Sequence, residues 1–223
     1  ALRTRTGDGH RYIADLYRRG VRSFVVGQVP AEAERLFPDA AFLLAVSPLK
    51  ALQRLAERHR EELQMPVVGI TGSNGKTTTT SLIYYILRQA GLNVGLAGNI
   101  GNSLALQVAR EQYDYYVIEL SSFQLDNMYD FRADVAILLN ITPDHLDRYD
   151  YKFENYADAK FRITRNQTAD DAFIYWAEDP IIDKYLQNPK QVFGATLHPY
   201  GLTQHYCLPI GEEELALKGR HNV

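Results

Sequence analysis

The chain has 223 residues, of which 46% are hydrophobic and 23% charged, a balance typical of a globular protein of one or two domains. Its net charge of −3 argues against a nucleic-acid-binding protein, and it lacks the run of about 18 apolar residues that a membrane-spanning helix needs. The one cysteine, Cys207, excludes an internal disulfide and suits a reducing compartment. We therefore expect a cytoplasmic monomer without nucleic-acid or membrane partners.

The first part of the chain, residues 1–65, predicts a small α/β domain. Apolar spacing predicts a helix over 11–19 that stops at Gly20. Further along we expect strands over 22–26 and 41–46, followed by a helix over 48–63.

Pro66 marks the predicted start of a second domain, residues 66–223, in which strands and helices alternate. This alternation indicates a mostly parallel sheet and hence an α/β fold. The expected strands cover 66–70, 94–97, 115–120, 135–140, 172–175 and 191–193. The expected helices cover 81–90, a segment ending at Ala109, 153–165 and 180–186.

A glycine-rich stretch, residues 69–80, joins the first strand of this domain to its first helix. A strand, such a turn, a Gly-Lys-Thr sequence and a helix form the arrangement that cradles phosphates, because several N–H groups point into one concavity at a helix N-terminus. Lys76 can reach the β- and γ-phosphates, and the Thr77 hydroxyl can hold Mg²⁺. Ile70 stands where the commonest form of the motif has its first glycine. We predict a P-loop-type ATPase domain; a glycine-rich turn with a chance Lys-Thr is the alternative.

Polar residues follow four predicted strands at their carboxyl ends, where open α/β sheets bind ligands. These segments are the glycine-rich turn, residues 98–101, residues 119–122 and residues 140–147. Glu119 closes an apolar strand, and a carboxylate beside a phosphate loop can hold Mg²⁺ directly or through water. A solvated acid at a strand end is the alternative.

Other polar side chains have both a functional and a structural interpretation. His145, in a turn rich in Asp, can be a metal ligand, a general base or an ordinary structural histidine. Asn99, between two glycines, suits contact with a sugar or phosphate, and a plain turn explains it equally well. Composition alone makes Lys160 a solvated helix lysine. Ser121 and Ser122 lack the Gly-x-Ser-x-Gly elbow of a hydrolase nucleophile.

Several blocks together resemble the Mur ligases, the ATP-dependent amide-forming ligases of peptidoglycan assembly. In chain order they are Gly-Ile-Thr-Gly-Ser-Asn-Gly-Lys-Thr-Thr, Gly-Asn-Ile-Gly, Glu-Leu-Ser-Ser-Phe-Gln-Leu-Asp, Asn-Ile-Thr-Pro-Asp-His-Leu-Asp-Arg and the terminal Gly-Arg-His-Asn. The resemblance covers residues 66–223. The block at 119–126 resembles the branch of the family that adds D-glutamate to UDP-N-acetylmuramoyl-L-alanine.

The resemblance implies roles for residues at the matching positions. The nucleotide ATP would contact Gly72, Ser73, Asn74, Gly75, Lys76, Thr77, Thr78 and Asn222. Thr77 and Glu119 would serve a first Mg²⁺, and His145 with a carbamylated Lys160 a second, because a carbamate is an anionic oxygen ligand for a hard metal. Asn99 and Ser121 would contact the muramoyl substrate. Lys76, His145 and Lys160 would take part in a two-step reaction through an acyl phosphate.

Residues 1–65 resemble a different branch of the family. The blocks Asp8-Gly9-His10-Arg11-Tyr12-Ile13 and Gly20-Val21-Arg22 are similar to the first, UDP-substrate-binding domain of the branch that adds D-alanyl-D-alanine. We therefore expect either an engineered fusion of two relatives or a divergent natural member. The family's C-terminal ligase domain is absent from these residues, and we expect the chain to be inactive alone. The alternatives are a D-alanyl-D-alanine-adding ligase and a non-catalytic nucleotide-binding module.

Overall fold

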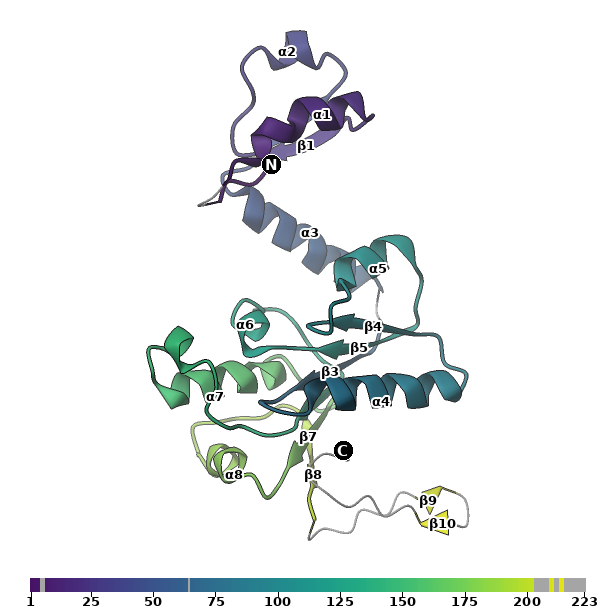
Figure 1. Ribbon diagram of the computed structural model, residues 1–223, viewed down its shortest axis with the longest axis vertical. Coiled ribbons are helices and arrows are strands. Elements are labelled where there is room, and N and C mark those ends of the chain that lie inside the picture. Colours follow the sequence, from purple (N-terminus) through teal and green to yellow (C-terminus); the bar gives the residue numbers. More distant parts are fainter. Residues whose placement is uncertain (5–6, 64, 203–208, 211–212, 215–223) are drawn as a thin grey trace. The chain divides into compact units, whose positions relative to one another are not determined.

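The computed structural model describes residues 1–4, 7–63, 65–202, 209–210 and 213–214. The chain divides into two compact units, Ala1–Gln64 and Met65–Val223, which are drawn in Figure 1. No helix in these described ranges is long and apolar enough to cross a membrane.

The first unit is a small α/β structure built on two strands. Its elements are η1 (Gly9–Tyr12), α1 (Ile13–Arg18), β1 (Ser23–Val26), α2 (Ala33–Leu36), β2 (Ala41–Leu44) and α3 (Pro48–Leu63). The strands β1 and β2 pair in parallel, and the buried side chains of Ile13, Phe24 and Val26 form its core. The helix expected over 48–63 is confirmed, whereas the one expected over 11–19 begins with a 3-10 turn.

The second unit contains a six-stranded sheet in the order β4-β5-β3-β6-β7-β8, and every pairing in it is parallel. The strands are β3 (Val67–Thr71), β4 (Val94–Gly98), β5 (Tyr115–Glu119), β6 (Val135–Leu138), β7 (Ala172–Trp176) and β8 (Thr196–Tyr200). A short antiparallel pair, β9 (Pro209–Ile210) and β10 (Glu213–Glu214), follows. The predicted α/β fold with a mostly parallel sheet is confirmed.

Helices cover both faces of this sheet. They are α4 (Lys76–Gln89), α5 (Leu104–Arg110), α6 (Ser122–Leu125), η2 (Leu146–Tyr149), α7 (Phe153–Phe161), η3 (Arg162–Thr164) and α8 (Pro180–Leu186). On one face, Ile83 and Leu87 of α4 pack against Ile70 and Val117. On the other face, side chains of α7 and α8 join a larger core. Because helices bury both faces of the sheet, the central strands are apolar almost throughout.

Several predicted boundaries are wrong. The helix expected over 81–90 begins at Lys76, because buried Thr79 and Thr80 continue it despite their β-branched side chains, and Thr80 Oγ1 donates to the Lys76 carbonyl at 2.7 Å. The helix expected over 153–165 ends at Phe161 and continues as η3. The strand expected over 135–140 ends at Leu138.

The strand expected over 191–193 is also wrong, because the last strand of the sheet is β8, Thr196–Tyr200. Phe193 packs onto the core from an irregular segment, and Val192 is 90% exposed. Pro199 makes β8 difficult to recognise in the sequence, because proline is rare in strands. It is tolerated here because β8 is an edge strand.

The sheet order places the candidate site. From the central strand β3 the chain runs outward to β4, back to β5, and then crosses to β6 on the other side of β3. Ligands of such sheets bind beyond the carboxyl ends of the strands where the direction switches. The segments that follow β3, β4, β5 and β6 therefore share one edge, as the sequence predicted.

Candidate functional site

The turn between β3 and α4 is a concave loop that leads into a helix N-terminus. Gly75 precedes α4 with φ +81°, a left-handed conformation that costs glycine little. Gly72 passes close to the segment after β6, where an added Cβ would lie 3.0 Å from the Cβ of Leu139. The loop thus depends on both glycines for its backbone path.

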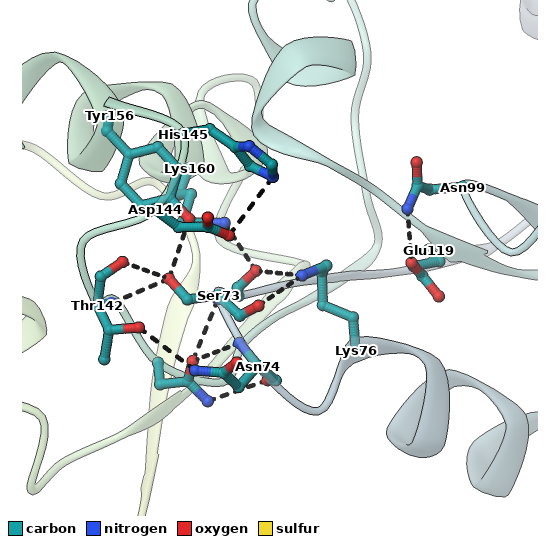
Figure 2. A network of polar contacts seen from close by, with 12 residues as sticks. Ser73, Asn74, Lys76, Asn99, Glu119, Thr142, Asp144, His145, Tyr156 and Lys160 are labelled. Atoms are coloured by element: carbon teal, nitrogen blue, oxygen red, sulfur yellow. Dashed lines mark hydrogen bonds and ion pairs between the residues drawn. The ribbon is translucent and has the colours of Figure 1, made fainter. Parts of the chain in front are cut away.

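The segment that follows β6 holds this loop in place. The Asn140 Oδ1 accepts hydrogen bonds from the N–H groups of Ser73 at 3.1 Å and Asn74 at 2.8 Å, and its Nδ2 donates to the Asn74 carbonyl at 3.1 Å. The Ser73 hydroxyl donates to the Thr142 carbonyl at 2.9 Å, and the Thr142 N–H donates to Ser73 Oγ at 2.9 Å. Tyr156 Oη lies 3.0 Å from the same Oγ. Figure 2 shows Ser73 with its contacts to Thr142 and Tyr156.

The N-terminus of α4 offers donors to an anion. The N–H groups of Lys76, Thr77 and Thr78 open the helix and have no acceptor within it, and the helix end carries a partial positive charge. The Lys76 ammonium donates to the carbonyls of Gly72 and Ser73, both at 2.8 Å. These groups together can bind phosphate oxygens.

The charge of Lys76 is balanced from two sides. Burial lowers the pKa of Lys76, and the nearby charges of Glu119 and Asp144 act in the opposite direction. In Figure 2 Lys76 lies between Glu119 with Asn99 and Asp144 with His145. Two strand ends thus bring carboxylates to the same lysine.

Glu119 is a buried carboxylate at the end of β5, with 1% of its surface exposed. The Thr77 hydroxyl donates to Oε2 at 2.8 Å, and Asn99 Nδ2 donates to Oε1 at 2.9 Å. A buried charge of this kind needs such partners. Gly98 packs closely against the backbone of Glu119, since a Cβ on this glycine would lie 2.2 Å from the Glu119 carbonyl oxygen.

The oxygens of Thr77 and Glu119 fit a hard divalent cation. Mg²⁺ commonly takes one or two carboxylates and completes its shell with water and substrate phosphates. The described residues include no cluster of three or more His, Cys, Asp or Glu side chains arranged for a metal. A magnesium ion here would therefore take most of its ligands from a bound phosphate and water, at the position these two residues define.

His145 lies in the turn after β6 with φ +48°, a left-handed conformation. Its Nε2 is 3.5 Å from an Asp144 carboxylate oxygen, and its side chain is 59% exposed. The ring centroid lies 5.2 Å from that of Phe123. The imidazole is therefore open to a ligand and only loosely fixed.

Lys160, on α7, is 2% exposed, which contradicts the expectation of a solvated helix lysine. Its ammonium donates to the Gly72 carbonyl at 2.7 Å and lies 4.7 Å from the centroid of the Tyr156 ring. Burial, with a smaller contribution from the charge of Lys76, lowers the pKa of Lys160 to about 7. The amine is therefore available in its neutral, nucleophilic form near neutral pH.

Residues 70–222 match the family model described as Mur ligase middle domain. This chain belongs to the Mur ligase family. Its sequence is 59% identical over 174 residues to a UDP-N-acetylmuramoylalanine–D-glutamate ligase of Bacteroides fragilis, a match that covers 70% of this chain and 39% of the relative. It is 50% identical over 210 residues to the protein of the same name from Cytophaga hutchinsonii, covering 83% of this chain and 46% of that one. The matched part of the chain thus spans less than half the length of these relatives.

Among solved structures, the chain is similar to a MurF ligase from Thermotoga maritima, determined in complex with ADP. The TM-score is 0.71 at 22% identity, and the match covers 92% of this chain and 47% of that one. At this identity the similarity concerns the Mur ligase fold alone.

The remaining predicted site residues of this Mur ligase chain are placed as follows. Ser121 caps α6: its hydroxyl donates to Gln124 Oε1 at 3.0 Å and accepts from the Gln124 N–H at 3.3 Å. The structure thus gives Ser121 a role in forming the helix, and its contact with substrate stays a prediction. Asn222 lies outside the described residues.

Sequence reasoning did not single out Asn140 or Tyr156, although both contact the loop of this Mur ligase chain. The available signal for Asn140 was its position, a polar residue beside the apolar run of β6 on a strand adjacent to β3. Tyr156 gave no such signal, because an aromatic residue on a helix is usually part of the core.

Proposed function

We propose that this chain is the ATP-binding part of a ligase that joins D-glutamate to UDP-N-acetylmuramoyl-L-alanine. The observation that carries the proposal is the group formed by Lys76, Thr77 and the buried Glu119 at the N-terminus of α4. Such a group suits a nucleotide triphosphate with its magnesium ion. The names of the Bacteroides and Cytophaga relatives support this choice of substrates.

In the proposed reaction, a carboxylate oxygen of the muramoyl substrate attacks the γ-phosphorus of ATP. The bond to the bridging oxygen breaks, and ADP leaves with that electron pair. The amine of D-glutamate then attacks the acyl carbon, phosphate leaves, and the amine loses a proton to form the amide. Lys76 and the N–H groups of α4 hold the phosphates, so the chain contributes positioning and charge neutralisation and needs no nucleophilic side chain.

Thr77 and Glu119 would hold a first Mg²⁺, which when bound neutralises charge on the phosphate oxygens. We propose a second ion site at His145 and a carbamylated Lys160. Carbamylation joins the neutral amine to CO₂ with loss of one proton and gives the anionic oxygens that a hard cation prefers. The burial of Lys160 and its lowered pKa support this step.

Substrate contacts by Asn99 and Ser121, nucleotide contact by Asn222, a UDP-binding role for the first unit, action as a monomer and a cytoplasmic location belong to the same proposal. A domain that helps bind ATP and the incoming amino acid would lie in the part of the relatives that this chain does not match. The 223-residue chain by itself should then bind nucleotide without completing the reaction.

The comparisons do not support a chain composed of two relatives, in which residues 1–65 come from a D-alanyl-D-alanine-adding ligase. The Cytophaga match covers 83% of this chain, more than residues 65–223 alone make up, so it reaches into the first unit. The likeness to MurF structures concerns the fold. The gene that encodes the chain can decide between one continuous relative and a fusion.

An assay of the full-length protein tests the substrates. With ATP and UDP-N-acetylmuramoyl-L-alanine, we expect phosphate release that depends on D-glutamate and is absent with D-alanyl-D-alanine. Turnover only with D-alanyl-D-alanine and the muramoyl tripeptide substrate would favour the other branch. Nucleotide binding without turnover on either substrate would favour a non-catalytic module.

A further inference from the structure

We propose that Asn140 is a positioning residue of the turn between β3 and α4, residues 72–75, which we call the phosphate loop. Its side-chain amide fixes Ser73 and Asn74 so that Lys76 and the N–H groups of α4 face the nucleotide phosphates. The proposal rests on the proposed function, since it takes the nucleotide to be the ligand of this loop.

The contacts of Asn140 continue the pairing of β3 with β6 beyond the end of both strands. Leu139 N–H donates to the Thr71 carbonyl at 3.0 Å, and the Ser73 N–H donates to the Asn140 carbonyl at 3.0 Å. At this point the loop turns away from β6, and the side chain of Asn140 continues the pairing. It offers one acceptor and one donor, as a peptide group does, to both sides of Asn74.

This arrangement decides which N–H groups are left for the phosphates. The N–H groups of Ser73 and Asn74 are directed to Asn140, so an anion meets those of the following residues. A loop fixed in this way loses little conformational entropy when the nucleotide binds, which favours affinity.

The segment that carries Asn140 is itself anchored. The N–H of the next residue, Ile141, donates to Asp179 Oδ2 at 2.9 Å. Asp179 is 2% exposed, and its Oδ1 accepts the N–H groups of Ile181 and Ile182 at the start of α8. The backbone next to Asn140 is therefore held by the start of α8, and Asn140 in turn holds the phosphate loop.

Asn166 offers a matched control. Its Nδ2 donates to the backbone carbonyls of Tyr129 at 2.8 Å and Phe131 at 2.9 Å. It is thus another asparagine that fixes a loop through its side-chain amide, but none of its partners belongs to the phosphate loop. Substitutions of Asn166 report the general cost of losing such bonds.

The test uses the full-length protein that contains this chain, with the variants Asn140→Ala, Asn140→Asp, Asn166→Ala and Asn166→Asp. Calorimetry gives the Kd of Mg-ADP, steady-state kinetics give the KM of ATP and of D-glutamate, and urea unfolding gives the stability. Asn140→Asp is nearly isosteric and keeps the acceptor, so it protects the test against misfolding of Asn140→Ala.

We expect both Asn140 variants to raise the Kd of Mg-ADP and the KM of ATP by about tenfold or more, from the lost hydrogen bonds. The KM of D-glutamate should stay within about twofold. The Asn166 variants should lower stability alone. Folded Asn140 variants that bind nucleotide as the wild type does, or Asn166 variants that weaken it equally, would overturn the positioning role. A wild-type protein that binds no nucleotide would instead overturn the proposed function itself.

Discussion

Glu119 flanks the phosphate loop on one side, and Asp144 with His145 flanks it on the other. The fold holds these two sides with different firmness. Glu119 is 1% exposed, and its two carboxylate oxygens accept hydrogen bonds from Thr77 at the start of α4 and from Asn99 after β4. His145 and Asp144, by contrast, have side chains that are 59% and 47% exposed and approach each other only to 3.5 Å. One side is built into the sheet, and the other is carried by a turn.

This difference indicates that the two sides contribute at different stages. The Glu119 side is in place before a ligand arrives, because its side-chain partners, Thr77 of α4 and Asn99 in the turn after β4, already hold both carboxylate oxygens. The His145 side has few contacts to hold it, and catalytic contacts often tighten only when a ligand binds. We infer that Glu119 belongs to the preformed nucleotide site and His145 to a site that a substrate or ion completes. The following substitutions test this comparison.

Lys76→Ala should have the largest effect, because Lys76 lies between the two sides and its ammonium donates to the Gly72 and Ser73 carbonyls of the loop. We expect kcat/KM for ATP in the full-length protein to fall by about 10²–10³-fold. Lys190→Ala, on an exposed segment, is the control and should leave kcat/KM unchanged. Equal values of kcat/KM for Lys76→Ala and Lys190→Ala would show that Lys76 does not act on the nucleotide.

Glu119→Gln should have the next largest effect. The substitution keeps the shape and can still accept the Thr77 hydroxyl, but it removes the charge that Mg²⁺ needs. We expect about 10–100-fold loss of kcat/KM, with part of it recovered at high Mg²⁺. A magnesium titration of this variant beside Glu154→Gln, an exposed control on α7, measures the effect. Identical magnesium curves would place the ion elsewhere.

His145→Asn should have a smaller effect, because the turn that carries His145 is exposed and loosely held. Asparagine tolerates the left-handed backbone of this position, so the free energy of unfolding should change by less than about 0.5 kcal/mol. The rate should nevertheless fall by about tenfold. A loss of stability as large as that of Glu119→Ala would show that the turn is structural and contradict an open site.

The pH dependence of Lys160 should give the smallest effect. Its pKa of about 7 means that the ammonium predominates below pH 7 and the amine above it. Only the amine can react with CO₂, so carbamylation should rise as the pH increases through 7. Carbon-13 NMR with labelled bicarbonate measures the carbamate, and Lys160→Arg should give no signal. A signal that falls with rising pH would contradict the assignment.

The sequence was informative where residues act through a local motif. The order of strand, glycine turn and Gly-Lys-Thr predicted the loop at Lys76, and an acid closing an apolar strand predicted the position of Glu119. The parallel sheet then brought Thr77, Asn99 and Glu119 together, as expected from strands whose carboxyl ends share an edge.

The sequence was uninformative where a role depends on contacts between distant segments. The hydrogen bonds of Asn140 to the loop join residues far apart in the chain, and its position after an apolar run gave no indication of which residues it contacts. Lys160 has the composition of a surface lysine, and only the packing of α7 reveals its burial. The strand β8 was missed because its few apolar residues and its proline look like a loop.

The nucleotide site can be examined in a crystal of the full-length protein with Mg²⁺ and a non-hydrolysable ATP analogue. We predict the β- and γ-phosphates at the N-terminus of α4 beside Lys76, with the ion in contact with the Thr77 hydroxyl and on the Glu119 side. Phosphates bound elsewhere, or an ion remote from Glu119, would show that this site is not the nucleotide site.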